Sequence, residues 1–409
     1  MPTLISLFSG AGGLDVGLEQ AGFETVTATD FDDNCIRTLL VNQQTHVPID
    51  GRPGRLHLDG ASVVQADIAD LSRSNLVPAD EENDWTPDLL VGGPPCQPFS
   101  SSGRQRSVLE GRGRLFEHFV RLARELKPRA ILFENVRGLV TARGRTGHPG
   151  EVLAEVKEAF EAAGYGTSFK LLNSADYGAP QRRVRLFMLA IRDAPIPRFP
   201  EPTHSRKQME NMFCETKPWV RLRELLANLP EPKSEDVVRP SDRLEPLLRN
   251  LPSGSGLKSN GRSEPTRPGG HWGYKQGTFV ADQDLPARTV TAASTQDWIR
   301  LSDGSLRRLT VRECAALQGF PPEWRFIGTK TSQFRQVGNA VPAVFGRILG
   351  LVLTEALKEH RSRRPASTPF PDDFRAAVEY TKRDHERNAV ARPRTNAVVQ
   401  DALRANGLS

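Results

Sequence analysis

The chain of 409 residues is long enough for two to three domains at about 150 residues each. Lysine and arginine number 55 against 49 acidic residues, and the net charge of +6 fits a polyanionic partner such as nucleic acid as well as an ordinary surface. The cysteines, Cys35, Cys96, Cys214 and Cys314, lie far apart, which excludes a disulfide framework and a zinc-finger spacing. The sequence has neither a signal-peptide pattern nor a run of 18 apolar residues. We therefore expect a soluble protein of a reducing compartment with no membrane partner.

Short apolar runs alternate with amphipathic stretches over the first 192 residues. The apolar runs predict strands at 3–8, 24–29, 62–66, 87–93 and 130–134, and the stretches between them predict helices at 13–21, 33–43, 113–127 and 150–163. Such alternation is typical of a parallel sheet covered by helices on both faces. The runs at 165–172 and 184–191 predict two further strands that close the sheet.

The texture of the sequence changes after residue 192. Residues 193–306 are rich in Pro, Gly, Ser and Arg with weak periodicity, which predicts a separate module of irregular or short-strand structure. A helical pattern resumes at 307–320, and 341–358 predicts an amphipathic helix that completes the first domain with the rest of 307–360. The tail at 361–409 begins with a basic, proline-containing stretch and continues into charged helical segments.

A glycine-rich segment, FSGAGGLDVGL at 8–18, follows the first predicted strand, where glycine lets a ligand approach the backbone at a helix N-terminus. The dinucleotide pattern needs a third glycine three residues after the second, but Asp15 stands there after Gly10 and Gly12. Asp30 ends the second strand, where a carboxylate accepts hydrogen bonds from ribose hydroxyls. The pattern favours a nucleoside without pyrophosphate, such as S-adenosylmethionine, over NAD, and an ordinary strand–helix turn fits it equally well.

Two further strand ends carry candidate catalytic groups. Cys96, in GGPPCQPFSSSG at 92–103, stands in a loop at the carboxyl end of a strand, a context that suits a thiolate nucleophile better than a buried cysteine. Glu134, in ILFENVRGL at 131–139, ends the next strand, where it either shares the cleft with Cys96 or simply favours a helix N-terminus.

Arginines and a glycine–asparagine pair mark two later segments. Arg183 and Arg185 in YGAPQRRVRLF alternate on one face of a strand, and the alternative to a functional role is an arginine-rich surface edge. The segment QVGNAVP at 336–342 opens the last helix of the first domain, or forms only a turn.

In this order, FSGAGG, PPCQPFS, ENV, QRRVR and QVGNAVP closely resemble the hallmark motifs of the cytosine-C5 DNA methyltransferase family, bacterial type. The segment RRLTVRECAALQGFP at 307–321 resembles a further block of that family with an architectural role. The resemblance implies an α/β fold with a Rossmann-like, S-adenosylmethionine-dependent methyltransferase sheet. The catalytic domain would comprise 1–192 and 307–360, and the smaller, irregular target-recognition domain 193–306, with a DNA cleft between them.

The resemblance also implies roles for individual residues. Carried over by motif position, Cys96 attacks C6 of cytosine and Glu134 binds N3 and the exocyclic amine. Arg185 holds O2, and Arg183 supports the loop and the cysteine. Asp30, in place of the more common glutamate, would bind the ribose of S-adenosylmethionine. The expected cofactor pocket comprises Phe8, Gly10, Gly12, Asp30, Asp67, Ile68, Pro95, Leu115, Asn339 and Val341, with Asp67 and Ile68 at the adenine and no metal.

The implied activity is that of a DNA (cytosine-5-)-methyltransferase, acting on a flipped-out cytosine in a specific duplex sequence through a covalent adduct between Cys96 and C6. Residues 97–112 are expected to close over the DNA, and LPARTVTAAS at 285–294 to place Thr289 beside the flipped nucleotide. Residues 262–279 suit base contacts, although such mixtures also occur in ordinary polar loops.

We expect a cytoplasmic, nucleoid-associated monomer of a restriction–modification or related defence system, with a cognate endonuclease or defence partner acting on the same site. The alternatives are a tRNA cytosine-C5 methyltransferase, which the long 193–306 segment disfavours, and a non-catalytic DNA-binding regulator, which the intact motifs disfavour. An NAD-dependent oxidoreductase would leave PPCQPFS unexplained.

Overall fold

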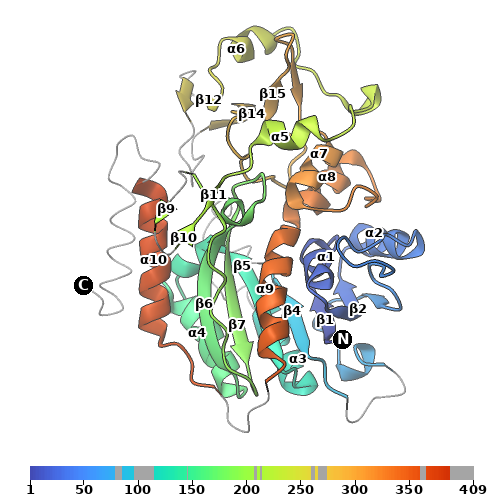
Figure 1. Ribbon diagram of the computed structural model, residues 1–409, viewed down its shortest axis with the longest axis vertical. Helices are drawn as coiled ribbons and strands as arrows, with labels where there is room; N and C mark the ends of the chain where they lie inside the picture. Colours follow the sequence, from blue (N-terminus) through green and yellow to red (C-terminus); the bar gives the residue numbers. More distant parts are fainter. Residues whose placement is uncertain are drawn as a thin grey trace.

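The computed structural model describes residues 1–78, 85–95, 115–144, 146–206, 210–211, 214–258, 263–265, 274–359 and 365–386. The larger part of the molecule is built on a seven-stranded sheet in the order β3-β2-β1-β4-β5-β7-β6 (Figure 1). Its strands are β1 (Thr3–Leu7), β2 (Glu24–Asp30), β3 (Ser62–Gln65), β4 (Leu89–Gly92), β5 (Ala130–Val136), β6 (Gly166–Asn173) and β7 (Val184–Ile191). Each run that the sequence analysis assigned to a strand in this region is therefore a strand.

The sheet differs from the predicted parallel sheet at one strand. β1 to β5 pair in parallel, but β7 is antiparallel to both β5 and β6. The reason is the connection: only the short 3-10 turn η3 (Ser174–Tyr177) and a few loop residues join β6 to β7, whereas a parallel pair needs a longer crossover. The order changes direction at β1 and β4, and open sheets of this kind bind ligands at the carboxyl ends of the strands there.

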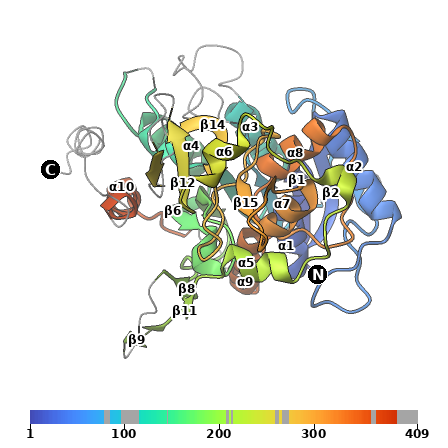
Figure 2. The same cartoon turned by 90° about the horizontal axis from the view of Figure 1, so that it is seen from above.

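Helices cover both faces of the sheet, as predicted (Figure 2). On one face, α3 (Leu115–Leu126) and α4 (Glu151–Ala162) bury an edge-to-face aromatic cluster formed by Phe119, Phe133 and Phe160. On the other face, α1 (Gly13–Gln20) packs against α9 (Ala343–Ala356). A Cβ at Gly17 or Gly346 would overlap the backbone of the opposite helix, so glycine permits this close approach. α2 (Asp33–Gln44) lies near the β2–β3 side.

The stretch Lys330–Ala356 is long and apolar enough by composition to cross a membrane, but 56% of its most apolar window is buried inside the molecule. The stretch comprises two helices, α8 (Lys330–Asn339) and α9. A short break that ends at Pro342 separates them. Its burial against α1 and the sheet identifies it as a pair of core helices.

A second, smaller group of elements lies above the carboxyl ends of the large sheet in Figure 1. Its five-stranded sheet has the order β13-β12-β14-β15-β16. The elements from residue 204 to residue 318 are short: β8 (His204–Ser205), β9 (Glu210–Asn211), β10 (Cys214–Glu215), β11 (Lys217–Pro218), α5 (Leu222–Ala227), η4 (Ser234–Asp236), α6 (Glu245–Arg249), β12 (Ser255–Lys258), β13 (Ser263–Pro265), β14 (Tyr274–Val280), β15 (Trp298–Arg300), β16 (Leu306–Arg308) and α7 (Val311–Gln318).

The helix expected from residue 307 begins later, at Val311. Leu306–Arg308 instead forms β16, which pairs with β15, and Thr310 then caps α7 by accepting a hydrogen bond from the Glu313 backbone N–H. The expected domain boundary between residues 306 and 307 falls inside this strand.

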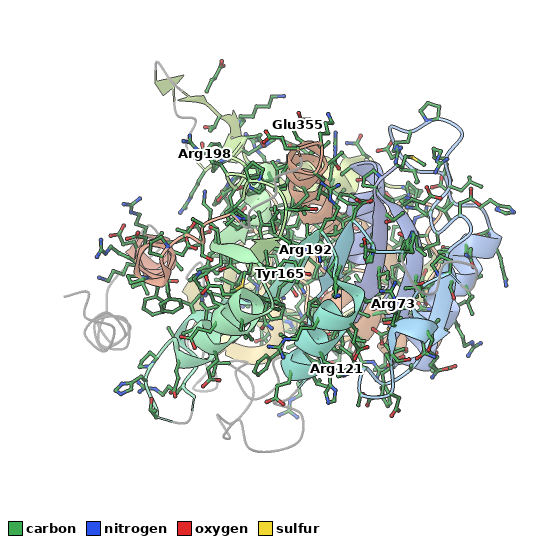
Figure 3. All side chains as sticks on the ribbon, turned by 90° about the horizontal axis from the view of Figure 1, so that it is seen from below. Arg73, Arg121, Tyr165, Arg192, Arg198 and Glu355 are labelled. Atoms are coloured by element: carbon green, nitrogen blue, oxygen red, sulfur yellow. The ribbon has the colours of Figure 1, made fainter. Side chains whose placement is uncertain are left out.

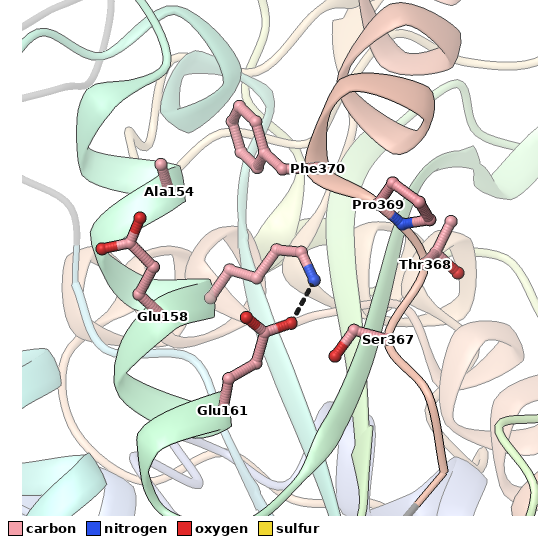
Figure 4. Close-up of a pocket in the computed structure, with 8 residues that line it drawn as sticks. Ala154, Glu158, Glu161, Ser367, Thr368, Pro369 and Phe370 are labelled. Carbon is pink, nitrogen blue, oxygen red and sulfur yellow. Dashed lines mark hydrogen bonds and ion pairs between the residues drawn. The ribbon is translucent and has the colours of Figure 1, made fainter.

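The tail contains a long helix, α10 (Phe370–Glu386), which stands beside the edge strand β6 (Figure 1). Phe374 and Ala377 are buried in the core, and the Thr368 N–H donates to the Thr167 carbonyl at 2.9 Å. Figure 4 shows the pocket at this junction, where the Lys157 ammonium lies 2.5 Å from Glu161 Oε1. The helix therefore covers a sheet edge.

Candidate active site

The glycine-rich turn after β1 has an unusual backbone. Phe8 and Gly10 have φ near 56° and Gly12 has φ 87°, the left-handed region that favours glycine. The turn is held by two backbone bonds, from the Ser9 N–H to the Thr29 carbonyl and from the Gly12 N–H to the Ser9 carbonyl, both 2.9 Å. A Cβ at Gly10 would meet no atom within 4 Å, whereas one at Gly12 would press on Leu39 and Trp324. Gly10 therefore borders open space, and the Cα of Gly12 faces the packed interior.

Asp30 and Gly10, both assigned to the expected cofactor pocket, are in direct contact. One Asp30 carboxylate oxygen accepts the Gly10 N–H and the other accepts the Asp32 N–H, each at 2.8 Å. Burial raises the pKa of Asp30, and these hydrogen bonds oppose that effect. Each carboxylate oxygen has two acceptor positions, so this half-buried group retains capacity for a ligand hydroxyl.

Asp15, which occupies the position of the missing third glycine, supports the turn from below. It is 2% exposed, and its Oδ1 accepts the Ser6 hydroxyl at 2.7 Å. The hydroxyl of Ser9, a residue of the turn, also donates a hydrogen bond to Ser6 Oγ at 2.8 Å. Burial raises the pKa of Asp15 to about 7, while the Ser6 hydrogen bond opposes the rise.

Phe31 is a candidate that the sequence analysis missed. Its side chain is 73% exposed and directly follows Asp30 at the carboxyl end of β2, beside the open space at Gly10. Exposed aromatic rings at a strand end are suited to stacking on a planar base. An aromatic residue immediately after a strand-terminal acid was the available sequence signal.

The remaining predicted cofactor residues lie at the ends of neighbouring elements. Asp67 is exposed and Ile68 buried just after β3, Pro95 is exposed after β4, and Leu115 begins α3. Asn339 is exposed at the end of α8, and the Val341 carbonyl lies where a Cβ on Gly13 would be. The segment QVGNAVP therefore ends α8 and precedes α9.

Glu134, which is buried, and Arg185, which is partly buried, form an ion pair between β5 and β7. Arg185 Nε lies 3.1 Å from Glu134 Oε1, and Glu134 is only 7% exposed. Burial raises the pKa of Glu134, and the guanidinium groups of Arg185 and Arg183 oppose that effect. β5 runs two residues beyond its predicted end, so Glu134 lies within the strand rather than at its terminus.

Gly93, three residues before Cys96 in the sequence, packs against this pair. A Cβ on Gly93 would clash with Glu134 Oε2, so glycine makes room for the carboxylate. The Asn135 side chain donates to the Pro94 carbonyl at 3.1 Å and holds the backbone that leads to the cysteine. Cys96 itself and residues 97–112 lie outside the described residues.

Arg183 is not the surface arginine of the alternative interpretation, because only 2% of it is exposed. Its guanidinium donates to the Val290 carbonyl at 3.0 Å and to the Asn339 carbonyl at 3.4 Å. It therefore joins β7 to the 285–294 segment and to QVGNAVP.

The 285–294 segment is bound to the loop before β7 by several hydrogen bonds. The Thr289 hydroxyl donates to the Arg182 carbonyl at 2.8 Å, and the Arg182 N–H donates to the Ala287 carbonyl at 2.8 Å. The fully buried Gln181 side chain accepts the Val290 N–H at 2.9 Å and donates to Gln318 Oε1 at 3.0 Å. Thr289 thus lies beside the strand that carries Arg185.

Aromatic rings and arginines organise the smaller sheet nearby. The Arg288 guanidinium lies 3.6 Å from the Phe279 ring centroid, and Arg308 lies 3.9 Å from that of Trp298. Of the 262–279 segment, 262 and 266–273 lie outside the described residues, so its base contacts stay a prediction.

The chain matches the family model for C-5 cytosine-specific DNA methylases over residues 3–353. It is 31% identical to the type II methyltransferase M.SacI of Streptomyces achromogenes over 87% of this chain and 93% of that one. It is 30% identical to the type II methyltransferase M.NgoFVII of Neisseria gonorrhoeae over 83% of each. A crystal structure of a prophage-encoded DNA modification methyltransferase from Escherichia coli, described as putative, shares the fold, with a TM-score of 0.62, 22% identity, and 88% and 100% coverage of the two chains.

The motifs, the sheet order and these similarities agree. The chain belongs to the C-5 cytosine-specific DNA methylase family.

Proposed function

We propose that this DNA cytosine-C5 methyltransferase attacks C6 of a flipped-out cytosine with Cys96, while Glu134 and Arg185 bind the polar edge of the ring. The observation that carries the proposal is the Glu134–Arg185 ion pair, whose carboxylate contacts Gly93, three residues before Cys96 in the sequence. Because a duplex shields C6, the base must leave the stack to reach this pair.

The residues around Gly10 fit S-adenosylmethionine. The open space at Gly10, the remaining acceptor capacity of Asp30 and the exposed ring of Phe31 suit an amino-acid nucleoside with a ribose and a flat base. We assign Asp30 to the ribose, Phe31 to one face of the adenine, and Asp67 with Ile68 to its edge. Asn339 and Val341 complete the pocket beside Phe8, Pro95 and Leu115.

The Glu134–Arg185 pair supplies a proton and a positive charge. Burial raises the pKa of Glu134, which favours the protonated carboxyl when the ring fills the site, and we assign to it the proton that N3 receives as the Cys96 sulfur bonds to C6. Arg185 stabilises the negative charge that develops at O2, and Arg183 holds the strand and the 285–294 segment in place. C5 gains electron density from this addition. Bound S-adenosylmethionine supplies the methyl group to C5 as an electrophilic sulfonium. Loss of the C5 proton to a base, expulsion of the Cys96 thiolate and return of the N3 proton to Glu134 restore the aromatic ring.

We further propose that residues 193–306, together with the rest of strand β16, form the target-recognition domain. Residues 1–192 and the chain after β16 up to residue 360 would form the catalytic domain. Thr289 would then lie beside the flipped nucleotide, because its hydrogen bond to Arg182 keeps it close to Arg185. The relatives named type II methyltransferases support a role in restriction–modification. A cytoplasmic monomer acting on duplex DNA, alongside an endonuclease of the same specificity, fits this role.

Trapping tests the covalent step directly. Long duplex DNA with 5-fluorocytosine in place of cytosine contains every short target, and fluorine at C5 cannot leave as the proton does. With S-adenosylmethionine, the wild-type chain should form a complex with this DNA that resists denaturation by detergent, and Cys96→Ala should form none. A resistant complex with Cys96→Ala, or none with the wild type, would contradict the proposal.

A further inference from the structure

The segment that follows β3 is irregular where the adenine is expected to bind. Asp67 is exposed, Ile68 is buried, and regular structure resumes only at the 3-10 turn η1 (Arg73–Asn75). Within the segment, Asp67 Oδ1 accepts the Ala69 N–H at 2.9 Å. Because this hydrogen bond joins residues only two positions apart, it does not fix where the segment lies relative to the sheet.

Arg121, on α3, holds this segment from the neighbouring element. Its Nη2 donates to the Ile68 carbonyl at 3.0 Å and to the Leu71 carbonyl at 2.8 Å, while Nη1 donates to Glu125 Oε1 at 2.8 Å. One nitrogen thus binds two carbonyls three residues apart, which fixes the curvature of the backbone between them. Glu125, one turn along α3, orients the guanidinium.

A second arginine makes the reciprocal contact. Arg73, in η1, donates through Nη1 to the Glu125 carbonyl at 3.4 Å and through Nη2 to the Trp85 carbonyl. Figure 3 labels Arg73 and Arg121 on the two adjoining elements. The segment and α3 are therefore joined in both directions by arginine–carbonyl bonds.

The helix that carries Arg121 also begins with Leu115, another residue of the proposed pocket, and it directly follows residues 96–114. We propose that Arg121 is a positioning residue for the cofactor: it holds the backbone at Ile68 and Leu71 so that Asp67 and Ile68 meet the adenine in register with Leu115. This inference rests on the proposed cofactor site.

The chemistry of the side chain supports this role. The guanidinium is permanently charged and presents several N–H groups in one plane, so it binds Glu125 and two carbonyls at once. A lysine at this position would keep the charge but not the fixed fork, and glutamine would lose both the charge and the reach. We therefore expect the affinity for the cofactor to fall in the order arginine, lysine, glutamine at position 121.

Calorimetric titration with S-adenosylhomocysteine, in the absence of DNA, measures this effect apart from catalysis. We expect Arg121→Gln to raise the Kd about tenfold and Arg121→Lys to raise it less. The matched control is Arg124→Gln, which removes an exposed arginine from the same helix and should leave the Kd unchanged. In methyl-transfer assays, Arg121→Gln should raise the KM for S-adenosylmethionine by the same factor, with kcat and the KM for DNA unchanged.

Three results would overturn the inference. An unchanged Kd for Arg121→Gln, with the wild type binding normally, would refute it and leave the proposed function intact. A loss of kcat or of folded protein, measured by thermal unfolding, without a change in KM would show that Arg121 serves only stability. Failure of the wild type to bind S-adenosylhomocysteine would refute the cofactor assignment and this inference with it.

Discussion

Gly93→Ala should inactivate the enzyme without unfolding it. The backbone of Gly93 is outside the left-handed region, so alanine is accommodated there without backbone strain. The new methyl group would, however, occupy the space of Glu134 Oε2, a terminal atom that can rotate away. The carboxylate would then leave its position 3.1 Å from Arg185 Nε.

The expected magnitude follows from that displacement. The new Cβ would lie 2.4 Å from Glu134 Oε2, whereas ordinary van der Waals contact begins at 3.4 Å, so the carboxylate must move by roughly 1 Å. A misplacement of that size costs about 100-fold in rate. This corresponds to about 2.7 kcal/mol of transition-state stabilisation. Glu134→Gln should cause a loss at least as large, and the double variant should lose little more than Glu134→Gln alone, because both changes act on one group.

Single-turnover methylation of duplex DNA measures the rate, and thermal unfolding measures the stability. Gly92→Ala is the informative comparison, since its Cβ would meet the Leu7 carbonyl at 2.6 Å and the Phe119 ring at 2.8 Å. That variant should lose stability, whereas Gly93→Ala should unfold at nearly the wild-type temperature. Gly93→Ala with more than a third of the wild-type rate would refute the role assigned to Glu134.

The remaining predictions concern support of the site and of the fold. Because burial raises the pKa of Asp15 from 3.8 to about 7, the unfolded chain ionises first and stability falls as pH rises from about 4 to 7. This contribution is at most about 4 kcal/mol, and urea unfolding at pH 5.5 and 8 should show a smaller fall for Asp15→Asn than for the wild type. Burial also raises the pKa of Glu134, so kcat should decline as pH exceeds that pKa, and a flat pH–rate profile with fully active Glu134→Gln would exclude the proton-donor role. Gln181→Leu leaves the Val290 N–H without its acceptor and should raise the KM for DNA about tenfold, checked by steady-state kinetics, with the affinity for S-adenosylhomocysteine unchanged. Removal of residues 361–409 should lower the unfolding temperature and promote aggregation, measured by calorimetry and light scattering, because Phe374 leaves the core and β6 loses its cover.

Local patterns predicted most of the large sheet and its site. Alternating apolar runs predicted the strands, and the position of motifs at carboxyl strand ends assigned Gly10 and Asp30 to one pocket. The structure places the two residues in contact, while their roles stay proposals. The Glu134–Arg185 pair also agrees with the resemblance-based assignment, although the roles of both residues stay proposals. The strands follow from short-range periodicity, and each site residue follows from a motif within one segment, whereas the Glu134–Arg185 pair joins two such segments.

Features that depend on distant contacts were not predictable in this way. The burial of Arg183 depends on carbonyls about 107 and 156 residues away, and the strand at Leu306–Arg308 exists because β15 pairs with it. Arg121 binds a segment some 50 residues earlier, and no local pattern distinguishes it from the exposed Arg124. These residues act through tertiary structure, which sequence spacing alone does not encode.

The most direct test of the central claim is methyl transfer from radiolabelled S-adenosylmethionine, with long duplex DNA and tRNA offered side by side and Cys96→Ala as the control. The account predicts label on the DNA alone, at C5 of cytosines within one recurring sequence identified by bisulfite sequencing, and none with Cys96→Ala. Label on tRNA alone, or on DNA with Cys96→Ala as with the wild type, would contradict it.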